Sequence, residues 1–225
     1  MCFSTSASFT VSTFLLSSGF YCLSHLGTRN TQYLPMTTIP ILFGIQQFCE
    51  GMVWLEINNL DSSLSKIYAL GFLFFSHYLW LFWMAFAVLV VETRRFFRRI
   101  LAVFTVVGIF YGSVLYFPLL LHPEQLSVNI WHGAIAYQAT LLGAQFIPSY
   151  LGIFIYASIS LIPLLISESR IFQNLGWLIF VALIFTKTIF SSTVVSTWCF
   201  FAAIISVYLV YVCLNDLLPN DSTVA

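Results

Sequence analysis

The chain has 225 residues, of which 60% are apolar and only 7% are charged, and its mean hydropathy is +0.96. Water-soluble domains carry roughly 25% charged residues, so this chain lacks the polar surface of a soluble protein. Its basic and acidic residues cancel, and no cluster of Lys and Arg is large enough to bind a nucleic-acid backbone. We therefore expect a multi-pass protein of the cell membrane that is surrounded by the lipid bilayer and does not bind nucleic acid.

Seven stretches of the sequence meet the requirement of about 20 mostly apolar residues for a helix that crosses the hydrocarbon core. They cover residues 8–26, 36–57, 67–91, 100–121, 147–167, 171–190 and 192–213. Polar or turn-forming residues separate most of them, and only the join between the sixth and seventh stretches is short. The prediction is a single all-α transmembrane domain, residues 1–225, built as a bundle of seven helices.

The basic residues predict the orientation of this bundle, because cytoplasmic loops carry an excess of Lys and Arg. With seven spans and the amino terminus outside, the cytoplasmic side receives Arg29, Arg94, Arg95, Arg98, Arg99 and Arg170. Only Lys66 and Lys187 lie on or toward the other side, so the carboxyl terminus is predicted inside. We expect the first span to be retained and not cleaved as a signal peptide, because no Lys or Arg precedes it.

The segment 122–146 between the fourth and fifth spans has two interpretations. Its second part, 131–146, is apolar enough to be a re-entrant helix or an eighth span. However, several of its residues would be poor neighbours for lipid on every face. These residues are Gly133, Tyr137, Gln138, Gly143 and Gln145. An extracytoplasmic hairpin or a re-entrant segment is the favoured prediction.

Glu50 stands out because a charged group at the centre of a membrane helix costs roughly 2.5–3.5 kcal/mol unless it is sheltered. In GIQQFCEGMVW, Gln46 and Gln47 precede it by four and three residues and Trp54 follows by four, so these side chains share one helix face. That face must point into the bundle. The alternative without a function is a protonated Glu50 that hydrogen-bonds Gln46.

His77, in FFSHYLWLFW, is a second ionisable residue within the bilayer. At 1.5 Å per residue from the outer helix ends, Glu50 lies about 10 Å deep, His77 about 16 Å and Lys187 about 5 Å. His132 belongs to the segment that could fold over this opening. The polar residues thus converge on the outer half of the bundle, although His77 could be a neutral imidazole bonded to a nearby Ser or Tyr, and Lys187 could extend to the interface.

The cysteines do not form a disulfide framework. Four of them lie within predicted spans without CxxC spacing, as is typical of small apolar filler. These are Cys22, Cys49, Cys199 and Cys213. Cys2 differs, because removal of Met1 would give it an α-amine beside its thiolate, and the two groups together could chelate a metal ion. Around Cys2, Ser4 and the following hydroxyl residues suit a helix that packs closely against others.

Four segments of the chain resemble, in order and separation, an uncharacterised family of small multi-span prokaryotic membrane proteins that begin Met-Cys-Phe-Ser. The segments are MCFSTSASF, LPMTTIPILFGIQQFCEGMVWL, YASISLIPLLIS and STWCFFAAIIS. The resemblance covers nearly the whole chain and singles out Cys2, Phe3, Ser4, Ala7, Ser8, Phe9, Gln46, Gln47, Glu50, Gly51, Trp54, Trp198, Cys199 and Phe200. Where the family carries His-Ile-x-Tyr, this chain has only HGAIAY, which puts His132 and Tyr137 in doubt. The resemblance implies no activity.

Three functions fit these observations. The first is a metal site at the outer mouth of the bundle, in which Cys2, Glu50, His77 and His132 supply the mixed ligands that suit zinc or copper. The surrounding pocket would be lined by Ser4, Gln46, Gln47, Trp54, Lys187 and Trp198. The second is a transporter or channel for a small solute or proton that uses Glu50 and His77. The third is a sensor that acts through an unidentified protein partner.

Two familiar seven-helix classes are excluded. A retinal protein needs a lysine near the middle of its last helix, whereas Lys187 lies near the end of the sixth. A membrane hydrolase with a zinc triad needs several histidines that face one cavity, and only His77 and His132 are candidates here. The sequence contains no Ser/His/Asp set or phosphate-binding loop, so whether the protein is an enzyme stays open.

Overall fold

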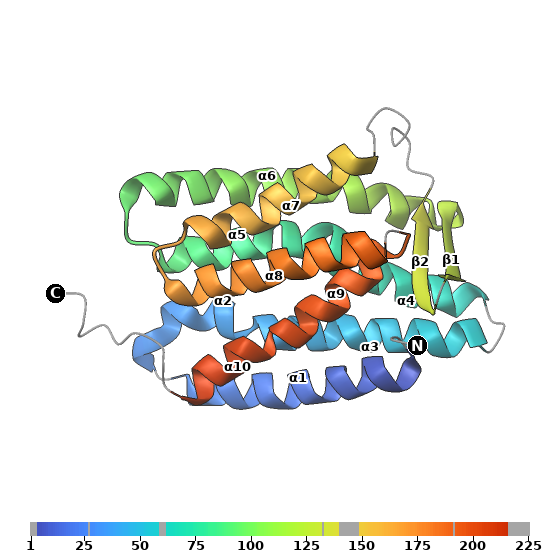
Figure 1. Ribbon diagram of the computed structural model, residues 1–225, viewed down its shortest axis with the longest axis horizontal. Helices are drawn as coiled ribbons and strands as arrows, with labels where there is room; N and C mark the ends of the chain where they lie inside the picture. The colour runs from blue at the N-terminus through green and yellow to red at the C-terminus, as the bar shows by residue number, and fades with distance from the viewer. Residues whose placement is uncertain are drawn as a thin grey trace.

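The computed structural model describes residues 4–26, 28–58, 62–131, 133–139, 149–190 and 192–215 as a bundle of long antiparallel helices with a β-hairpin across one end (Figure 1). The α-helices are α1 (Thr5–His25), α2 (Leu34–Thr37), α3 (Ile39–Asn58), α4 (Ser62–Leu73), α5 (Trp80–Val91), α6 (Arg95–Leu121), α7 (Ser149–Ile166), α8 (Arg170–Ile189), α9 (Val194–Ile205) and α10 (Val207–Leu214). The strands are β1 (Leu126–Trp131) and β2 (Ala134–Ala139). Short 3₁₀ helices η1 (Thr28–Tyr33) and η3 (Pro123–Gln125) and a π-helical turn η2 (Phe74–Leu79) complete the order.

Seven long helical rods make up the described part of the bundle. α4, η2 and α5 are continuous, and α9 and α10 form one rod that is interrupted only at Ser206. The other rods are α1, α3, α6, α7 and α8. The predicted helical fold is therefore confirmed.

Four of the rods are long and apolar enough to cross a membrane, namely Leu64–Val91, Arg95–Leu121, Arg170–Ile189 and Val194–Leu214. The apolar part of α7, Leu151–Ile166, is shorter. α1 and α3 do not reach the same hydropathy, because α1 carries many hydroxyl residues and α3 carries two glutamines and two glutamates. Many of these polar side chains are buried within the bundle, including Ser8, Ser12, Gln46, Gln47 and Glu50.

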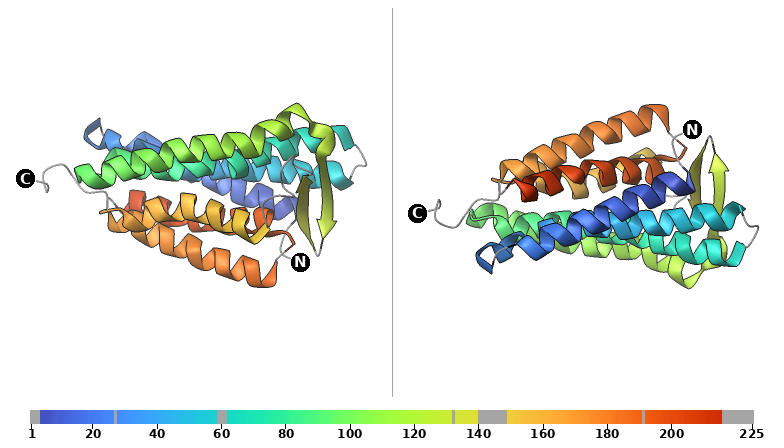
Figure 2. Two further views of the ribbon diagram at one scale, coloured as in Figure 1. Left: turned by 90° about the horizontal axis from the view of Figure 1, so that it is seen from above. Right: turned by 90° about the horizontal axis from the view of Figure 1, so that it is seen from below.

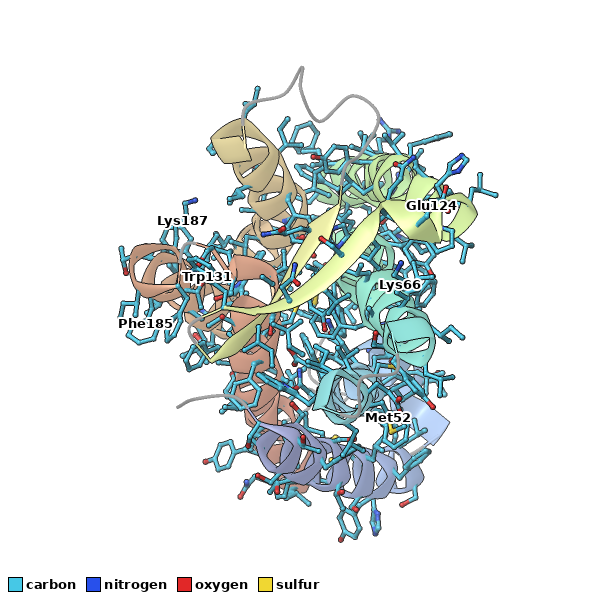
Figure 3. The ribbon with its side chains drawn as sticks, turned by 90° about the vertical axis from the view of Figure 1, so that its right-hand side faces the viewer. Met52, Lys66, Glu124, Trp131, Phe185 and Lys187 are labelled. Carbon is cyan, nitrogen blue, oxygen red and sulfur yellow. The ribbon has the colours of Figure 1, made fainter. Side chains whose placement is uncertain are left out.

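The two ends of the bundle differ in their charges and connections (Figures 1 and 2). We call the end with β1 and β2 the hairpin end; α3 and α6 end there, and α4, α7 and α9 begin there. We call the opposite end the arginine end, because it carries the connections 92–94 and 167–169 with Arg94, Arg95, Arg98, Arg99 and Arg170. Lys66 and Lys187 lie at the hairpin end (Figure 3).

The β-hairpin follows from the alternation of apolar and polar residues in LSVNIW, which has the period of two that suits a strand. Leu126 pairs with Ala139 and Trp131 with Ala134 in an antiparallel register. Gly133 has a φ of 76°, which suits glycine in the tight turn between the strands. The sequence predicted a hairpin or a re-entrant segment here but no strands, and this alternation is the signal that was missed.

The hairpin lies across the end of the bundle and does not cross it (Figure 3). The face that carries Leu126 and Ile135 is apolar and turns toward the bundle, since both side chains are fully buried, and Ala134 beside them is buried as well. These residues join a hydrophobic cluster with Phe72 of α4 and Phe200 of α9. α6 ends and α7 begins at this same end, so the described residues between them form a cap and not an eighth span.

α1 packs closely against α3, as its small residues predict. A Cβ atom added at Gly44 would lie 2.9 Å from Leu16, and one added at Gly51 would lie 2.9 Å from Phe9. The Ser12 hydroxyl donates a hydrogen bond to the Gly44 carbonyl oxygen at 2.8 Å. Glycine at these two positions lets the helix backbones approach each other.

The arginine half of the interior is filled by one hydrophobic cluster. Its members include Met36, Ile39, Met84, Val88, Leu101, Leu164, Phe172 and Leu175. The polar residues that could carry chemistry lie in the other half, beneath the hairpin.

Candidate functional site

Glu50 lies on the inner face of α3 and is only 1% exposed. The Ser196 hydroxyl of α9 donates a hydrogen bond to Glu50 Oε1. Glu50 Oε2 is buried and has no hydrogen-bond partner among the described residues. Half of this carboxyl group is therefore still able to bind another molecule.

Gln46 lies one turn before Glu50, and it too has one side-chain polar atom with a hydrogen-bond partner and one without. Its Oε1 accepts a hydrogen bond of 2.7 Å from the indole Nε1 of Trp80, and Trp80 stacks on Phe43 at 4.0 Å between ring centroids. The amide Nε2 of Gln46 has no hydrogen-bond partner in the part of the chain that the structure describes. The thiol of Cys199 lies against this same side chain.

Further buried polar atoms without described partners lie around Glu50. Gln47 is near Glu50, but neither of its polar side-chain atoms makes a hydrogen bond of good geometry. The Trp54 indole nitrogen and the Tyr137 hydroxyl are also unpartnered among the described residues. Tyr137 reaches the group from the hairpin, stacks on Phe72 at 4.9 Å and is close enough to interact electrostatically with Glu50. Each such atom costs roughly 1–3 kcal/mol when nothing binds it.

We call this group the Glu50 cluster; its members are Gln46, Gln47, Glu50, Trp54, Tyr137 and Ser196. Helix α3 supplies four of them at helical spacing, α9 supplies one and β2 supplies one. Buried polar atoms in native proteins are nearly always hydrogen-bonded, to protein or to ordered water. So many unpartnered donors and acceptors in one place mark a position where ordered water or another polar group could bind.

A cavity of about 350 Å³, which we call the His77 cavity, lies between η2, α6, α7 and α9. It is lined by Ser76, His77, Tyr111, Leu115, Gly152, Ile153, Tyr156, Val194, Val195, Trp198 and Cys199. Small-molecule sites typically have volumes of roughly 300–1,000 Å³ and are mainly apolar with a few polar groups. The His77 cavity fits that description in both size and lining.

The imidazole of His77 is oriented by its neighbour. Its Nδ1 shares a hydrogen bond of 2.9 Å with the Ser76 hydroxyl, which leaves Nε2 as the ring nitrogen for a guest. Tyr156 fixes the backbone beside it, because its hydroxyl donates to the Ser76 carbonyl oxygen at 2.5 Å. Both residues belong to or contact η2, and π-helical turns within α-helices are frequent at functional sites.

Cys199 connects the two parts of the site. It lines the His77 cavity, lies against Gln46 and follows Ser196 by one turn of α9. It also lines a smaller space of about 40 Å³ between Trp80 and Trp198. A guest in the cavity would therefore be separated from the Glu50 cluster by little more than the Cys199 side chain.

The residues that the sequence assigned to the site are only partly brought together. Glu50, Gln46, Gln47 and Trp54 lie in the Glu50 cluster, and His77 and Trp198 line the cavity. Ser4 lies elsewhere: it is exposed, caps α1 and hydrogen-bonds Ser6 at 2.9 Å. Lys187 also lies elsewhere, in a groove between α7 and α8.

The predicted metal site is only partly within the described residues. Cys2 and His132 lie outside them. Within the described ranges, no three His, Cys, Asp or Glu side chains are grouped so that they could hold a metal ion. Glu50 and His77 alone provide too few ligands for zinc or copper.

Several residues of the site were not predicted from the sequence. Ser196, Tyr111 and Tyr156 reach it from α9, α6 and α7, and the sequence assigned none of the three to the site. Cys199 was interpreted as filler. The available signal was the SST and STWC polar stretch at the start of the last span, which interrupts an otherwise apolar helix.

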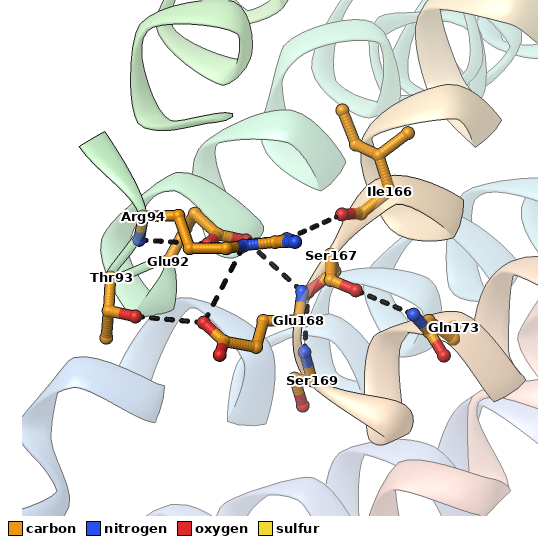
Figure 4. Close-up of polar contacts among 8 residues, drawn as sticks. All are labelled: Glu92, Thr93, Arg94, Ile166, Ser167, Glu168, Ser169 and Gln173. Carbon is orange, nitrogen blue, oxygen red and sulfur yellow. Dashed lines mark hydrogen bonds and ion pairs between the residues drawn. The ribbon is translucent and has the colours of Figure 1, made fainter. Parts of the chain in front are cut away.

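A second polar network lies at the arginine end (Figure 4). Glu92 accepts hydrogen bonds from Arg94 Nε at 2.7 Å and Nη2 at 3.0 Å, and from the backbone N–H of Glu168 at 3.2 Å. Arg94 also donates to the Ile166 carbonyl oxygen at 2.9 Å. Burial alone raises the pKa of Glu92, but hydrogen bonds from Arg94 and Glu168 outweigh it and hold the pKa below its usual value. This network ties the two connections together.

Comparison with known proteins gives a family but no activity. The chain matches a family of unknown function, DUF6629, over residues 1–222. It belongs to that family. The resemblance to an uncharacterised family is therefore confirmed, and it supplies no substrate or reaction. No curated protein and no solved structure matches the chain.

Proposed function

We propose that this member of the family of unknown function is a seven-helix integral membrane protein that binds a small molecule at the hairpin end. The amino terminus lies outside and the carboxyl terminus inside, in keeping with the arginines at the opposite end. The observation that carries the proposal is the His77 cavity, with its volume of about 350 Å³, beside the unpartnered buried atoms of the Glu50 cluster.

The guest has a mainly apolar body and at least one hydrogen-bonding group. The cavity walls are mostly aliphatic and aromatic, and none of its lining residues carries a formal charge when His77 is neutral. His77 Nε2 and the Tyr111 hydroxyl are the polar groups that could fix its orientation. Such a molecule partitions into the bilayer, which in this proposal surrounds the helices α6 and α7 that line the cavity.

Binding is favoured over conduction through the membrane. A path for protons or solutes needs polar groups along the whole bundle, but the arginine half is filled by apolar side chains such as Met84, Leu164 and Phe172. Flux in liposomes that disappears in Glu50→Gln would instead support a transporter.

The test uses a variant that fills the cavity. A Cβ atom added at Gly152 would meet nothing within 4 Å, so Gly152→Trp should be accommodated and should occupy the space of the guest. Protein is purified in mild detergent, denatured and extracted, and the extract is analysed by mass spectrometry. We expect a compound that accompanies the unaltered protein and is lost from Gly152→Trp.

Leu151→Trp is the matched control, because Leu151 is the preceding residue of α7 and is 40% exposed. It should retain the compound. The same complement of small molecules in all three preparations would contradict the proposal.

The orientation is tested separately with single cysteines. Asn129→Cys in exposed β1 should react with a membrane-impermeant maleimide added outside intact cells, and Arg98→Cys should react only after the membrane is opened. The reverse pattern would overturn the orientation but not the binding site.

A further inference from the structure

A groove on the outside of the bundle, between α7 and α8, is distinct from the His77 cavity. The two helices are held together toward the arginine end, where a Cβ atom added at Gly176 would lie 2.9 Å from Leu164. They separate toward the hairpin end (Figures 1 and 2). The resulting groove has a volume of about 440 Å³.

The groove has the length and chemistry of a site for one lipid chain. From Ile153 to Leu165 its α7 wall runs for about 18 Å at 1.5 Å per residue. This length is close to one leaflet of a hydrocarbon core about 30 Å thick. Phe154 and Ile184 on its two walls are 68% and 51% exposed, so the apolar surface is open to an occupant.

A single cation marks the wide end of this groove. Lys187 lies in the last turn of α8 and lines the groove, and it points outward on the side where α7 lies (Figure 3). None of the ion pairs formed by the described residues involves Lys187. Lys66, at the same end, differs because it lies close enough to Glu124 to interact with that carboxylate.

We propose that the α7–α8 groove binds one anionic phospholipid, with an acyl chain along the groove and the headgroup phosphate at Lys187. An unneutralised lysine near the membrane surface attracts anionic lipid by about 1 kcal/mol, which corresponds to roughly a fivefold preference over a zwitterionic lipid. The apolar walls supply the binding of the chain, and Lys187 supplies the headgroup selectivity. Ile153 borders both spaces, so lipid in the groove packs against α7 next to the His77 cavity.

The test compares phosphatidylglycerol and phosphatidylcholine with the same acyl chains, added to the full chain in nonionic detergent and counted by native mass spectrometry. The unaltered protein should bind phosphatidylglycerol about fivefold more tightly. Lys187→Gln should reduce that ratio to about one, whereas Lys66→Gln should leave it unchanged. Equal binding of both lipids to the unaltered protein, or a ratio that Lys187→Gln does not alter, would overturn the proposal.

A second variant locates the acyl chain. Ala157→Trp places an indole within the groove and should weaken the binding of both lipids, while Val103→Trp on the exposed face of α6 should not. Unaltered lipid binding by Ala157→Trp would overturn the placement. Dimers that Ala157→Trp disrupts in the absence of lipid would instead identify the occupant as a second copy of the chain. Because these residues do not line the His77 cavity, failure here leaves the Gly152→Trp test unaffected.

Discussion

Two carboxylates are buried at opposite ends of the bundle, and the protein holds them in different ways. Both oxygens of Glu92 accept hydrogen bonds, from the Arg94 guanidinium and from backbone N–H groups. Glu50 accepts one from Ser196, and its second oxygen has no partner among the described residues. Glu92 is also neutralised by a cation, whereas the ion pairs of the described residues do not include Glu50.

The difference separates a structural role from a binding role. A fully satisfied buried network stabilises one arrangement of the chain, and here it joins the α5–α6 connection to the α7–α8 connection. A half-satisfied network carries a free-energy penalty that a bound molecule can remove. We therefore expect changes at the arginine end to act on stability and changes at the hairpin end to act on binding.

The largest effect is expected from Arg94→Ala. This change leaves the Glu92 carboxylate buried without its cation, and breaking such a pair typically costs about 3–5 kcal/mol. Arg94 is itself 39% exposed, so we expect a loss of about 3 kcal/mol. The free energy of unfolding in mixed detergent micelles measures it. Arg170→Ala is the control: Arg170 is exposed and, among the described residues, donates a hydrogen bond to Gln173, so its loss should change stability by less than about 0.5 kcal/mol.

A pair of isosteric changes compares the two carboxylates directly. In Glu92→Gln, the new amide group faces the N–H donors of Arg94 or Glu168, so we expect a loss of about 2 kcal/mol. In Glu50→Gln, the remaining oxygen can still accept from Ser196, and we expect a change of less than about 1 kcal/mol. The same unfolding measurement serves for both. Equal losses would mean that Glu50 is as structural as Glu92.

The pH dependence of stability should come from the arginine end. The pKa of Glu92 is lower in the folded protein than its ordinary value of 4.5, so the folded state binds this proton less readily than the unfolded state. The resulting stabilisation is present above pH 4.5 and is lost as pH falls through the folded pKa, by at most about 1.4 kcal/mol per pH unit. Unfolding measured between pH 3 and 7 should therefore show an acid loss that is smaller in Glu92→Gln. An identical profile in that variant would assign the acid loss to other groups.

Much of the helical fold could be predicted, because a helix long and apolar enough to cross a membrane is a long run of apolar residues in the sequence. The stretches 67–91 and 100–121 correspond to Leu64–Val91 and α6 within a few residues at each end. The strands of the hairpin could not be predicted in the same way, because the five alternating residues of LSVNI in β1 are a weak signal beside the apolar stretch that follows. The polar stripe on α3 was readable for the same reason as the helices, since one helix supplies most of it.

The residues that contact this polar stripe could not be predicted from the sequence, because they come from distant parts of the chain. Ser196 is 146 residues from Glu50, and nothing local shows that α9 will face α3. The position of a residue along the bundle axis could be predicted better than the face of the helix on which its side chain lies. Lys187 lies at the hairpin end as expected, but the buried face of α8 carries Leu183 and Thr186 and leaves Lys187 outside.

The smallest expected effects come from two glycine substitutions beside the His77 cavity. They test whether the helices at the hairpin end are tightly packed, as at the arginine end, although polar groups of the Glu50 cluster lack hydrogen-bond partners. A Cβ atom added at Gly112 would lie 3.0 Å from Tyr78 Cα and 3.1 Å from the His77 carbonyl oxygen. Gly112→Ala should therefore displace η2 and destabilise the protein by about 1 kcal/mol.

At Gly152, on the other side of the cavity, an added Cβ meets nothing within 4 Å. Gly152→Ala should stabilise the protein by about 0.5 kcal/mol, because alanine favours the helix over glycine. If Gly112→Ala lowers the free energy of unfolding and Gly152→Ala raises it, the cavity has one rigid wall, at η2, and one open wall, at α7. Changes of the same sign would mean that η2 can move, and the His77 imidazole would then not be held in place before a guest binds.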